Sequence, residues 1–270
     1  MLLLANSELY NNCLHTALAK QIKFTEEAFA EGANSDMGEY AIAGSDAIIQ
    51  IIGPTTYKYD FWSWLMGGTS YQGLMKKLQD ANADESVERI ILLMDTPGGQ
   101  VTGLKEVAAA IKNSAKEVIT FIDPCCASAG LYMASQCSRI VGVPSAEIGS
   151  LGTQTVRYSE FRALEEQGID VKVIKAEIGP YKNLGHPLEP LSEEAIAEAQ
   201  QRVDKMGEEF LATVAEGRGV TYDFARENFG GGRMLFADDA IAVGLMDEVM
   251  SLSELVSENR GYKPKLKRRL

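Results

Sequence analysis

A serine at a strand-to-helix junction is the first feature of this chain that could do chemistry. Ser128 follows an apolar segment, 117–122, that we predict to be a strand, and it opens a predicted helix at 128–136. The first N–H groups of a helix have no partner inside it, so they can receive the charge that develops when a serine attacks a carbonyl. Small neighbours let a substrate backbone come close. By itself, the segment also fits a tightly packed turn with a structural serine.

A serine nucleophile needs a base that removes its proton, and histidine is the usual one. The chain has only two histidines, His15 and His186. His15 is remote in sequence from every glycine turn, whereas His186 lies in a loop flanked by prolines. A triad of Ser128, His186 and Asp95 is therefore one hypothesis, although nothing in the spacing favours it.

A lysine is the alternative base, because Ser–Lys pairs can replace the triad. A lysine accepts a proton only when its amine is neutral, and burial away from water favours that form. Lys182 lies between Gly179 and Gly185, has apolar neighbours, and has no acidic residue within four positions. The setting is compatible with a desolvated amine and also with an ordinary surface lysine.

Two adjacent glycines could supply N–H donors for a developing oxyanion. Gly98 and Gly99 follow a predicted strand at 89–94, and no side chain obstructs their backbone. The N–H of Ala129, next to Ser128, would be the second donor. Such donors are usually the largest catalytic contribution, about 3 kcal/mol each. The plainer interpretation is a turn that needs glycine for its geometry.

Strands and helices alternate through the middle of the chain, which predicts an α/β fold with a mainly parallel sheet and flanking helices. Sites in such folds lie beyond the carboxyl ends of the strands, so the turns at 96–99 and 124–128 would face one cleft. We predict that the strand at 117–122 breaks at Asp123-Pro124. The other predicted strands are 46–52, 139–143, 147–156 after an initial turn, and 170–175; the other predicted helices are 70–82, 102–113, 160–167 and 192–215.

The two ends of the chain are predicted to lie outside the main domain. We predict an N-terminal helical arm over residues 1–44, with its helix at 7–29, then a main domain over 45–258 and a basic flexible tail over 259–270. The aromatic stretch 57–68 fits core or lid packing, and alternatively a patch that faces a substrate or another subunit.

Composition limits the possible partners and compartments. The net charge of −12 argues against a general nucleic-acid binder, so we expect no specific nucleic acid as a partner. Four cysteines without a CxxC pair favour a reducing compartment. We see no convincing signal peptide and no apolar run long enough for a membrane helix, and therefore expect a cytoplasmic protein without a membrane anchor. We expect no metal and no cofactor.

Five short motifs, in this order, resemble those of the S49 peptidase family within the broader Clp-protease/crotonase-like fold. They are Asp95-Thr-Pro-Gly-Gly99, with threonine where the family has serine, Ala127-Ser-Ala-Gly130, Gly149-Ser-Leu-Gly152, Tyr181-Lys-Asn183, with asparagine where the family has aspartate, and Gly244-Leu-Met-Asp247. The family includes signal peptide peptidase A and phage head-maturation proteases. The glycines and aromatics at 53–57, 61–64 and 67–68 resemble the phage members more.

The resemblance implies a serine endopeptidase in which Ser128 is the nucleophile and Lys182 the general base. It implies that Ser150 orients the lysine amine and that Gly98 or Gly99, with Ala129, forms the oxyanion site. Residues 45–258 would be the catalytic domain.

The family cuts peptide bonds, often after small residues, and assembles as homo-oligomeric rings in which subunits complete each other's sites. By resemblance, the substrate would be a capsid or scaffold protein during phage head maturation, in the host cytoplasm or the virion. Three alternatives stay open: a bacterial peptidase that degrades signal peptides, a non-catalytic ring-forming structural protein, and an acyl-CoA hydratase or isomerase of the same fold. The last is disfavoured because those enzymes typically use glutamate, and none occurs between Pro97 and Lys105 or between Phe121 and Gly142.

Overall fold

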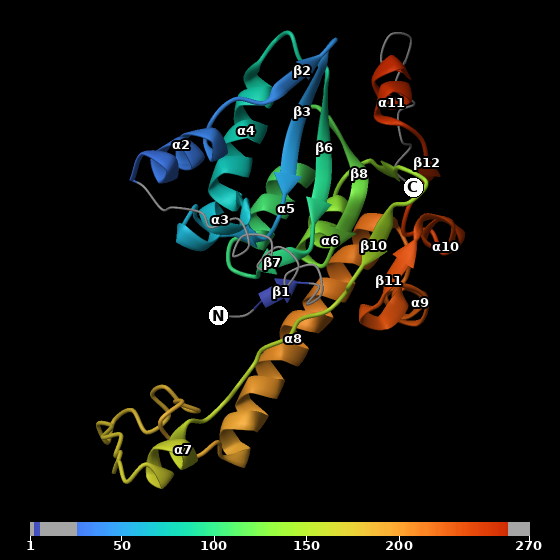
Figure 1. The fold of residues 1–270 in the computed structure, drawn as a ribbon. Coiled ribbons are helices and arrows are strands. Elements are labelled where there is room, and N and C mark those ends of the chain that lie inside the picture. The colour runs from blue at the N-terminus through green and yellow to red at the C-terminus, as the bar shows by residue number, and fades with distance from the viewer. Residues whose placement is uncertain (1–2, 6–25, 259–270) are drawn as a thin grey trace.

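A mostly parallel sheet forms the centre of the computed structural model, which describes residues 3–5 and 26–258 (Figure 1). The sheet runs in the order β11-β10-β8-β6-β3-β2, and β9 pairs with both β8 and β12. The α/β fold predicted from the alternation of elements is confirmed. The strands are β2 (Ala41–Ala43), β3 (Asp46–Ile52), β6 (Arg89–Thr96), β8 (Glu117–Ala127), β9 (Arg139–Gly142), β10 (Glu147–Gly149), β11 (Met234–Phe236) and β12 (Glu248–Val249).

The long strand β8 organises this sheet. Its first half pairs with β9 and its second half with β10, while β6 runs along its other edge. The predicted break at Asp123-Pro124 is wrong, because β8 continues to Ala127. A bulge absorbs these residues: the register moves from Met94 opposite Ile122 to Thr96 opposite Cys126. The strand therefore ends directly at Ser128.

A second, small sheet lies beside the carboxyl end of β6. Its order is β1-β7-β4-β5, with β1 at Leu3–Ala5, β7 at Gly98–Gln100, β4 at Thr55–Thr56 and β5 at Thr69–Ser70. Strand β7 follows β6 after one intervening residue. The sequence analysis did not predict any of these four strands, since each has only two or three residues.

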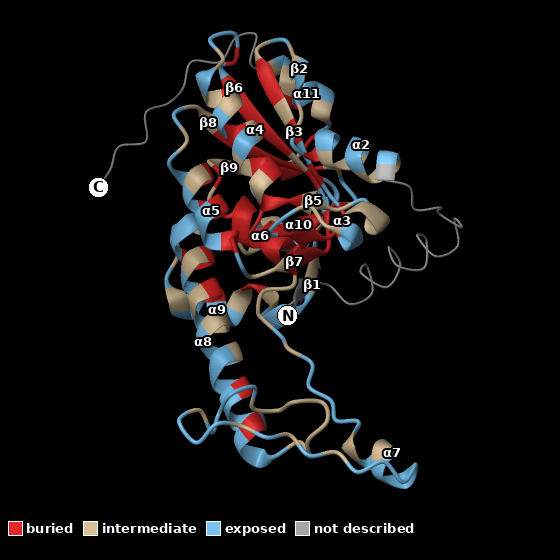
Figure 2. Ribbon diagram, turned by 90° about the vertical axis from the view of Figure 1, so that its left-hand side faces the viewer, coloured by how far each residue is buried: buried red, intermediate tan, exposed pale blue. Residues whose placement is uncertain are grey.

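Helices bury both faces of the main sheet. Strand residues alternate in direction, so Ile90 and Leu92 of β6 face one hydrophobic cluster and Ile91 faces the other. The larger cluster is covered by α4 (Tyr71–Ala83), α5 (Leu104–Lys112), α6 (Ala129–Ala134) and the end of α8 (Glu193–Arg218). The smaller cluster lies under α11 (Leu252–Glu258). Figure 2 shows this buried centre in red around α6 and the strands.

The remaining short helices complete the core. Helices α9 (Tyr222–Asn228), η1 (Gly230–Gly232) and α10 (Ala237–Ala242) follow α8. In the aromatic stretch, α3 (Phe61–Met66) begins at Asp60, whose side chain accepts from the Ser63 N–H at 2.8 Å. Phe61 and Trp62 of α3 remain exposed.

The region predicted as an N-terminal arm is only partly described. Most of the helix predicted at 7–29 lies outside the described residues, and the described helix α2 covers Glu26–Asp36. Helix α2 is docked on the core: the Asp36 carboxylate accepts from the Ser70 N–H at 2.8 Å, and the Trp64 indole donates to the Ala28 carbonyl at 3.1 Å. The predicted tail at 259–270 lies outside the described residues.

Residues 150–192 leave the core as a long excursion, which we call the arm. The arm includes α7 (Phe161–Glu166) and returns along α8, and Figures 1 and 2 show it projecting from the core with mostly exposed residues. The predicted strand at 170–175 is absent from the described structure, and β10 ends at Gly149 instead of continuing to 156. Both segments have strand-like composition, but a strand also needs a neighbour that satisfies its backbone.

Candidate active site

Ser128 has a strained backbone between β8 and α6. Its φ of 54° and ψ of −111° lie outside the regions that ordinary residues adopt. The neighbouring structure holds it there: the Ser128 N–H donates to the Gly149 carbonyl at 2.8 Å, and its carbonyl accepts from the Tyr132 N–H at 2.9 Å. Such strain costs about 1–3 kcal/mol and is found preferentially at functional sites. The flanking elements thus hold one serine in a strained turn.

Ser128 is a buried residue, yet its hydroxyl has no hydrogen-bond partner among the described residues. The residue is 1% exposed. Every fully enclosed polar side-chain atom in the described part of the chain has a partner, so the Ser128 oxygen must still be reachable from outside. A buried hydroxyl is normally paired, since an unmade hydrogen bond costs about 1–3 kcal/mol. This serine is therefore placed to receive a partner that the described residues do not supply.

The predicted oxyanion donors lie around this serine. Ala129 is the first residue of α6, and its N–H has no acceptor within residues 3–5 and 26–258. The Gly98 N–H donates to the Thr96 hydroxyl at 3.1 Å, and that hydroxyl donates to the Gly53 carbonyl at 2.7 Å. In this state, the Gly98 donor is therefore engaged and the Ala129 donor is free.

Close backbone packing joins the glycine turn to α6 and to β4. A Cβ atom on Gly99 would lie 1.9 Å from the Thr55 carbonyl oxygen, so only glycine fits there. A Cβ atom on Gly130 would lie 2.7 Å from the Thr96 methyl group. Because Gly130 and Ser128 flank Ala129, this packing fixes the glycine turn next to the serine.

Ser150 is also close to the backbone of Ser128. It follows Gly149, the residue whose carbonyl accepts the Ser128 N–H, and it has a positive φ of 56°. Its own N–H donates to the Arg233 carbonyl at 2.9 Å. The structure thus brings Ser128, Ala129, Ser150 and the glycine turn together.

Lys182 is not brought to this group. It is exposed, and residues 168–190 lie at the far end of α8 from the sheet (Figure 1). All hydrogen bonds and ion pairs that the described structure contains for residues 168–190 stay within the arm, such as the Lys175–Glu189 pair at 2.8 Å. The base predicted by resemblance and the serine are therefore far apart within a single chain.

The histidine alternative gains no support from the geometry. His186 lies in the same projecting segment, where its Nδ1 accepts from the Leu188 N–H at 3.1 Å. His15 lies outside the described residues. Asp95 is exposed at the end of β6, and partial burial together with the nearby Asp123 raises the pKa of its carboxyl group. No described interaction connects Asp95 with His186.

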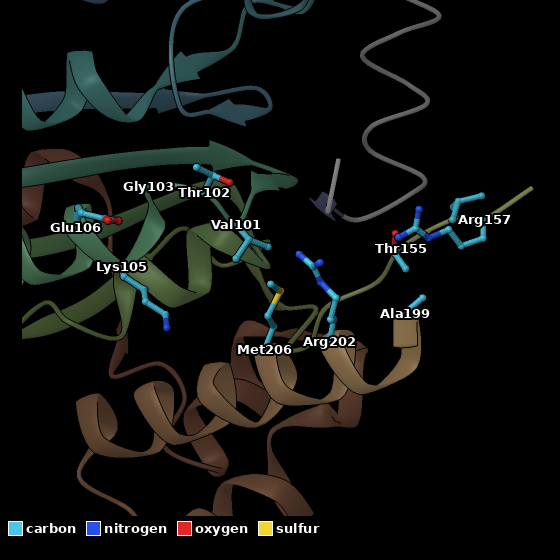
Figure 3. A pocket seen from close by; sticks show the side chains of 11 residues that line it. Val101, Thr102, Gly103, Lys105, Glu106, Thr155, Arg157, Ala199, Arg202 and Met206 are labelled. Carbon is cyan, nitrogen blue, oxygen red and sulfur yellow. The ribbon is translucent and has the colours of Figure 1, made fainter. Parts of the chain in front are cut away.

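A cavity of about 570 Å³ opens beyond the end of β7 (Figure 3). Val101, Thr102 and Gly103 line one side, and Arg157 of the arm and Arg202 of α8 line the other. Neither arginine has an ion-pair partner in the described ranges. The sequence analysis missed this cavity, because residues so far apart along the chain form no motif.

Strand β1 is the second feature that the sequence analysis missed. Its residues pair antiparallel with β7: Leu3 lies opposite Gln100, Leu4 opposite Gly99 and Ala5 opposite Gly98. This pairing places an early segment of the chain along the glycine turn.

In the described part of the chain, no helix is both long and apolar enough to cross a membrane.

Comparisons with known proteins bear on the family of the chain and on its fold. A family model, Peptidase family S49, matches residues 110–263. The chain is 29% identical over 236 residues to the head-tail preconnector protein GP5 of Enterobacteria phage P21, covering 86% of this chain and 46% of that protein. It is 28% identical over 223 residues to the capsid assembly protease C of Escherichia phage lambda, covering 82% and 50%. The chain thus spans about half the length of these curated relatives.

Solved structures show the same fold at low sequence identity. A mutant of the 1510-N membrane-bound stomatin-specific protease aligns with a TM-score of 0.52 and 20% identity, covering 80% of this chain and 84% of that chain. A mutant ClpP1 from Listeria monocytogenes aligns with a TM-score of 0.50 and 14% identity, covering 77% and 94%. These likenesses confirm the Clp-protease-like fold. Because the family model covers more than half of the sequence, the chain belongs to peptidase family S49.

Proposed function

We propose that the chain is a serine endopeptidase with Ser128 as nucleophile and Lys182 as general base. The observation that carries the proposal is the Ser128 hydroxyl, which belongs to a buried residue with a strained backbone, is unpaired among the described residues and is still reachable from outside. A purely structural serine would be expected to satisfy its hydroxyl locally. Membership of a peptidase family supports the same conclusion.

The proposed reaction follows from the atoms around Ser128. A neutral Lys182 amine removes the hydroxyl proton while the serine oxygen attacks the substrate carbonyl. The resulting oxyanion accepts hydrogen bonds from Ala129 and from Gly98 or Gly99. The C–N bond then breaks, the lysine returns the proton to the leaving amine, and water hydrolyses the acyl-serine in the same way. The Ser150 hydroxyl orients the lysine amine.

We propose that Lys182 reaches Ser128 from a neighbouring copy of the chain in a homo-oligomeric ring. In one copy, the arm exposes several apolar side chains, a pattern that marks interaction surfaces. The most exposed are Val156 at 81%, Ile174 at 87% and Ile178 at 97%. Docking the arm on the next copy would cover these side chains and withdraw the lysine amine from water, which favours its neutral form. A head-to-tail contact of this kind forms a ring when the rotation between successive copies closes.

We propose a capsid or scaffold protein as the substrate, cleaved in the host cytoplasm or in the virion. The names of the two phage relatives support this class. Cleavage after a small side chain is what the family resemblance implies. Residues 45–258 would form the catalytic domain, with residues 1–44 as an N-terminal arm and 259–270 as a flexible tail.

The test uses Ser128→Ala and Lys182→Ala variants and a fluorophosphonate probe that labels activated serines. We expect each variant to lose about 10⁴-fold or more of the peptidase activity. In the parent protein, the probe should be found on Ser128 by mass spectrometry. Lys182→Arg is a matched control, because it keeps a cation of similar reach that cannot become neutral, and it should be equally inactive. Wild-type activity in Ser128→Ala would overturn the proposal and favour a structural role.

A further inference from the structure

Strand β1 occupies a sheet edge that would otherwise be open. Strand β7 pairs with β4 on one side and with β1 on the other, and β1 ends the small sheet. Without Leu3–Ala5, β7 would present unpaired backbone N–H and C=O groups. Such an edge is a ready template for an extended peptide, whose main-chain hydrogen bonds supply the affinity.

The direction of β1 brings the chain toward Ser128. Because the pairing is antiparallel and Ala5 lies opposite Gly98, the direction of the strand from Leu3 to Ala5 points toward Thr96. Thr96 pairs with Cys126 just before the end of β8, and its methyl group packs against Gly130 in the first turn of α6. A peptide bound in this direction therefore passes the start of α6 just beyond the residue opposite Gly98.

We infer that the outer edge of β7 binds the peptide substrate as an antiparallel strand, and that Leu3–Ala5 occupies this edge as an intramolecular pseudosubstrate. The assignment of a substrate to this edge rests on the proposed function, whereas the competition between strands can be measured without catalysis. A segment tethered to the same chain competes at a high effective concentration, about millimolar for a short flexible linker. A three-residue ladder is weak enough for a longer peptide to displace it.

The test compares the full chain with Leu3→Pro/Leu4→Pro and Leu3→Ala/Leu4→Ala variants, all carrying Ser128→Ala to prevent cleavage. Successive N–H groups of a strand point to opposite sides, so the two prolines remove a donor toward β7 in either hydrogen-bond register. The alanine variant keeps both donors and serves as the control. The probe is a fluorescent synthetic peptide with the sequence of residues 1–8, and binding is followed by fluorescence polarisation.

We expect the peptide to bind the proline variant about 10-fold more tightly than the parent, as the loss of one backbone hydrogen bond from the competing strand implies. The alanine variant should bind like the parent. Bound peptide should slow hydrogen exchange at Gly98–Gln100 in the proline variant. Equal binding by all three proteins, or bound peptide without protection of β7, would overturn the inference. If binding follows the expectation but the same variants with Ser128 intact cleave nothing, the proposed function fails and the edge assignment stands.

The cavity beyond β7 carries a second inference, which extends the first to residues upstream of the bound strand. Gln100 pairs with Leu3 and is followed by the cavity-lining Val101, so residues upstream of a strand bound on β7 reach the cavity. Arg157 and Arg202 give this cavity two cations without ion-pair partners among the described residues. The other charged residues of its lining are Lys105, which pairs with Glu209 at 2.6 Å, and Glu106, so the lining is cationic on balance. We propose that the cavity receives acidic side chains upstream of the cleaved bond.

Its test uses two peptides that differ only in glutamate or lysine upstream of a fixed strand sequence. The proline variant should bind the glutamate peptide about 10-fold more tightly, and Arg202→Glu should reverse the preference. Arg162→Glu, on α7 and outside the cavity lining, changes the net charge equally and should leave the preference unchanged. Equal binding of both peptides, or the same shift with Arg162→Glu, would contradict a specific acidic subsite.

Discussion

Mixing two inactive variants offers a sharp test of how Lys182 reaches Ser128. A Ser128→Ala chain keeps its lysine, and a Lys182→Ala chain keeps its serine. The structure puts the lysine in an exposed arm whose described hydrogen bonds and ion pairs stay within the arm over residues 168–190. If the arm acts on a neighbouring copy, a mixed ring contains some intact sites, although neither protein forms one alone.

The expected size of the recovered activity follows from counting. Each site needs an intact serine from one copy and an intact lysine from the next. In a random equimolar ring each condition holds for about half of the positions, so about a quarter of the sites should be complete. If the lysine instead folds back on its own chain, every chain lacks one member and the mixture stays inactive.

The assay follows cleavage of a reporter peptide after the two proteins are dissociated together, allowed to reassemble and separated by size. Different affinity tags on the two variants verify that rings contain both chains. Mixing each variant with a differently tagged copy of itself is the control and should yield no activity. Verified mixed rings that remain as inactive as the separate proteins would refute delivery of the lysine by a neighbour.

Three further predictions concern stability. Gly99→Ala places a methyl group 1.9 Å from the Thr55 carbonyl oxygen, and we expect a loss of about 1–3 kcal/mol in unfolding free energy, measured by urea denaturation. Arg89→Met leaves the buried carboxylate of Asp46 without the arginine that donates to it at 2.7 and 2.9 Å, and should cost about 3–5 kcal/mol in unfolding free energy. Partial restoration by the additional Asp46→Leu change would confirm that the buried carboxylate is responsible, with the lost hydrogen bond from Arg89 to the Leu255 carbonyl accounting for the rest. Asp95→Asn should raise the melting temperature at pH 7. Folding raises the pKa of the Asp95 carboxyl group, so the stability that this group contributes is present below its pKa in the unfolded chain and is lost as the pH rises through its pKa in the folded chain. The gain from Asp95→Asn should shrink toward pH 3, and an equal gain at both pH values would contradict the assignment.

The parts of the fold that local sequence determines were predictable. The alternation of apolar strands and amphipathic helices gives β3, β6, β8 and the helices around them, and Ser128 sits at its junction because β8 ends and α6 begins there. The arm could not be predicted in the same way. Segment 170–175 has the composition of a strand, but no described strand lies beside it to complete a ladder.

The contact between β1 and β7 shows a second limit. Residues 3–5 and 98–100 are separated by more than ninety positions, and three-residue strands give almost no periodic signal. The bulge at Asp123-Pro124 is comparable, since a proline in an apolar run is normally interpreted as the end of a strand. Only the pairing with β6 and β10 shows that β8 continues to the serine.

Helix α8 determines how far the arm projects. Its 26 residues span about 39 Å, with the Ser192 side chain capping one end and Gly219 ending the other. The C-terminal half of α8, with Phe210 and Val214, is buried in the core, so the helix acts as a rigid spacer. Deleting one residue from its exposed half would shorten the reach by only about 1.5 Å but would rotate everything beyond it by roughly 100°. The spacing and angular phase between successive catalytic centres would then be encoded in the length of one helix.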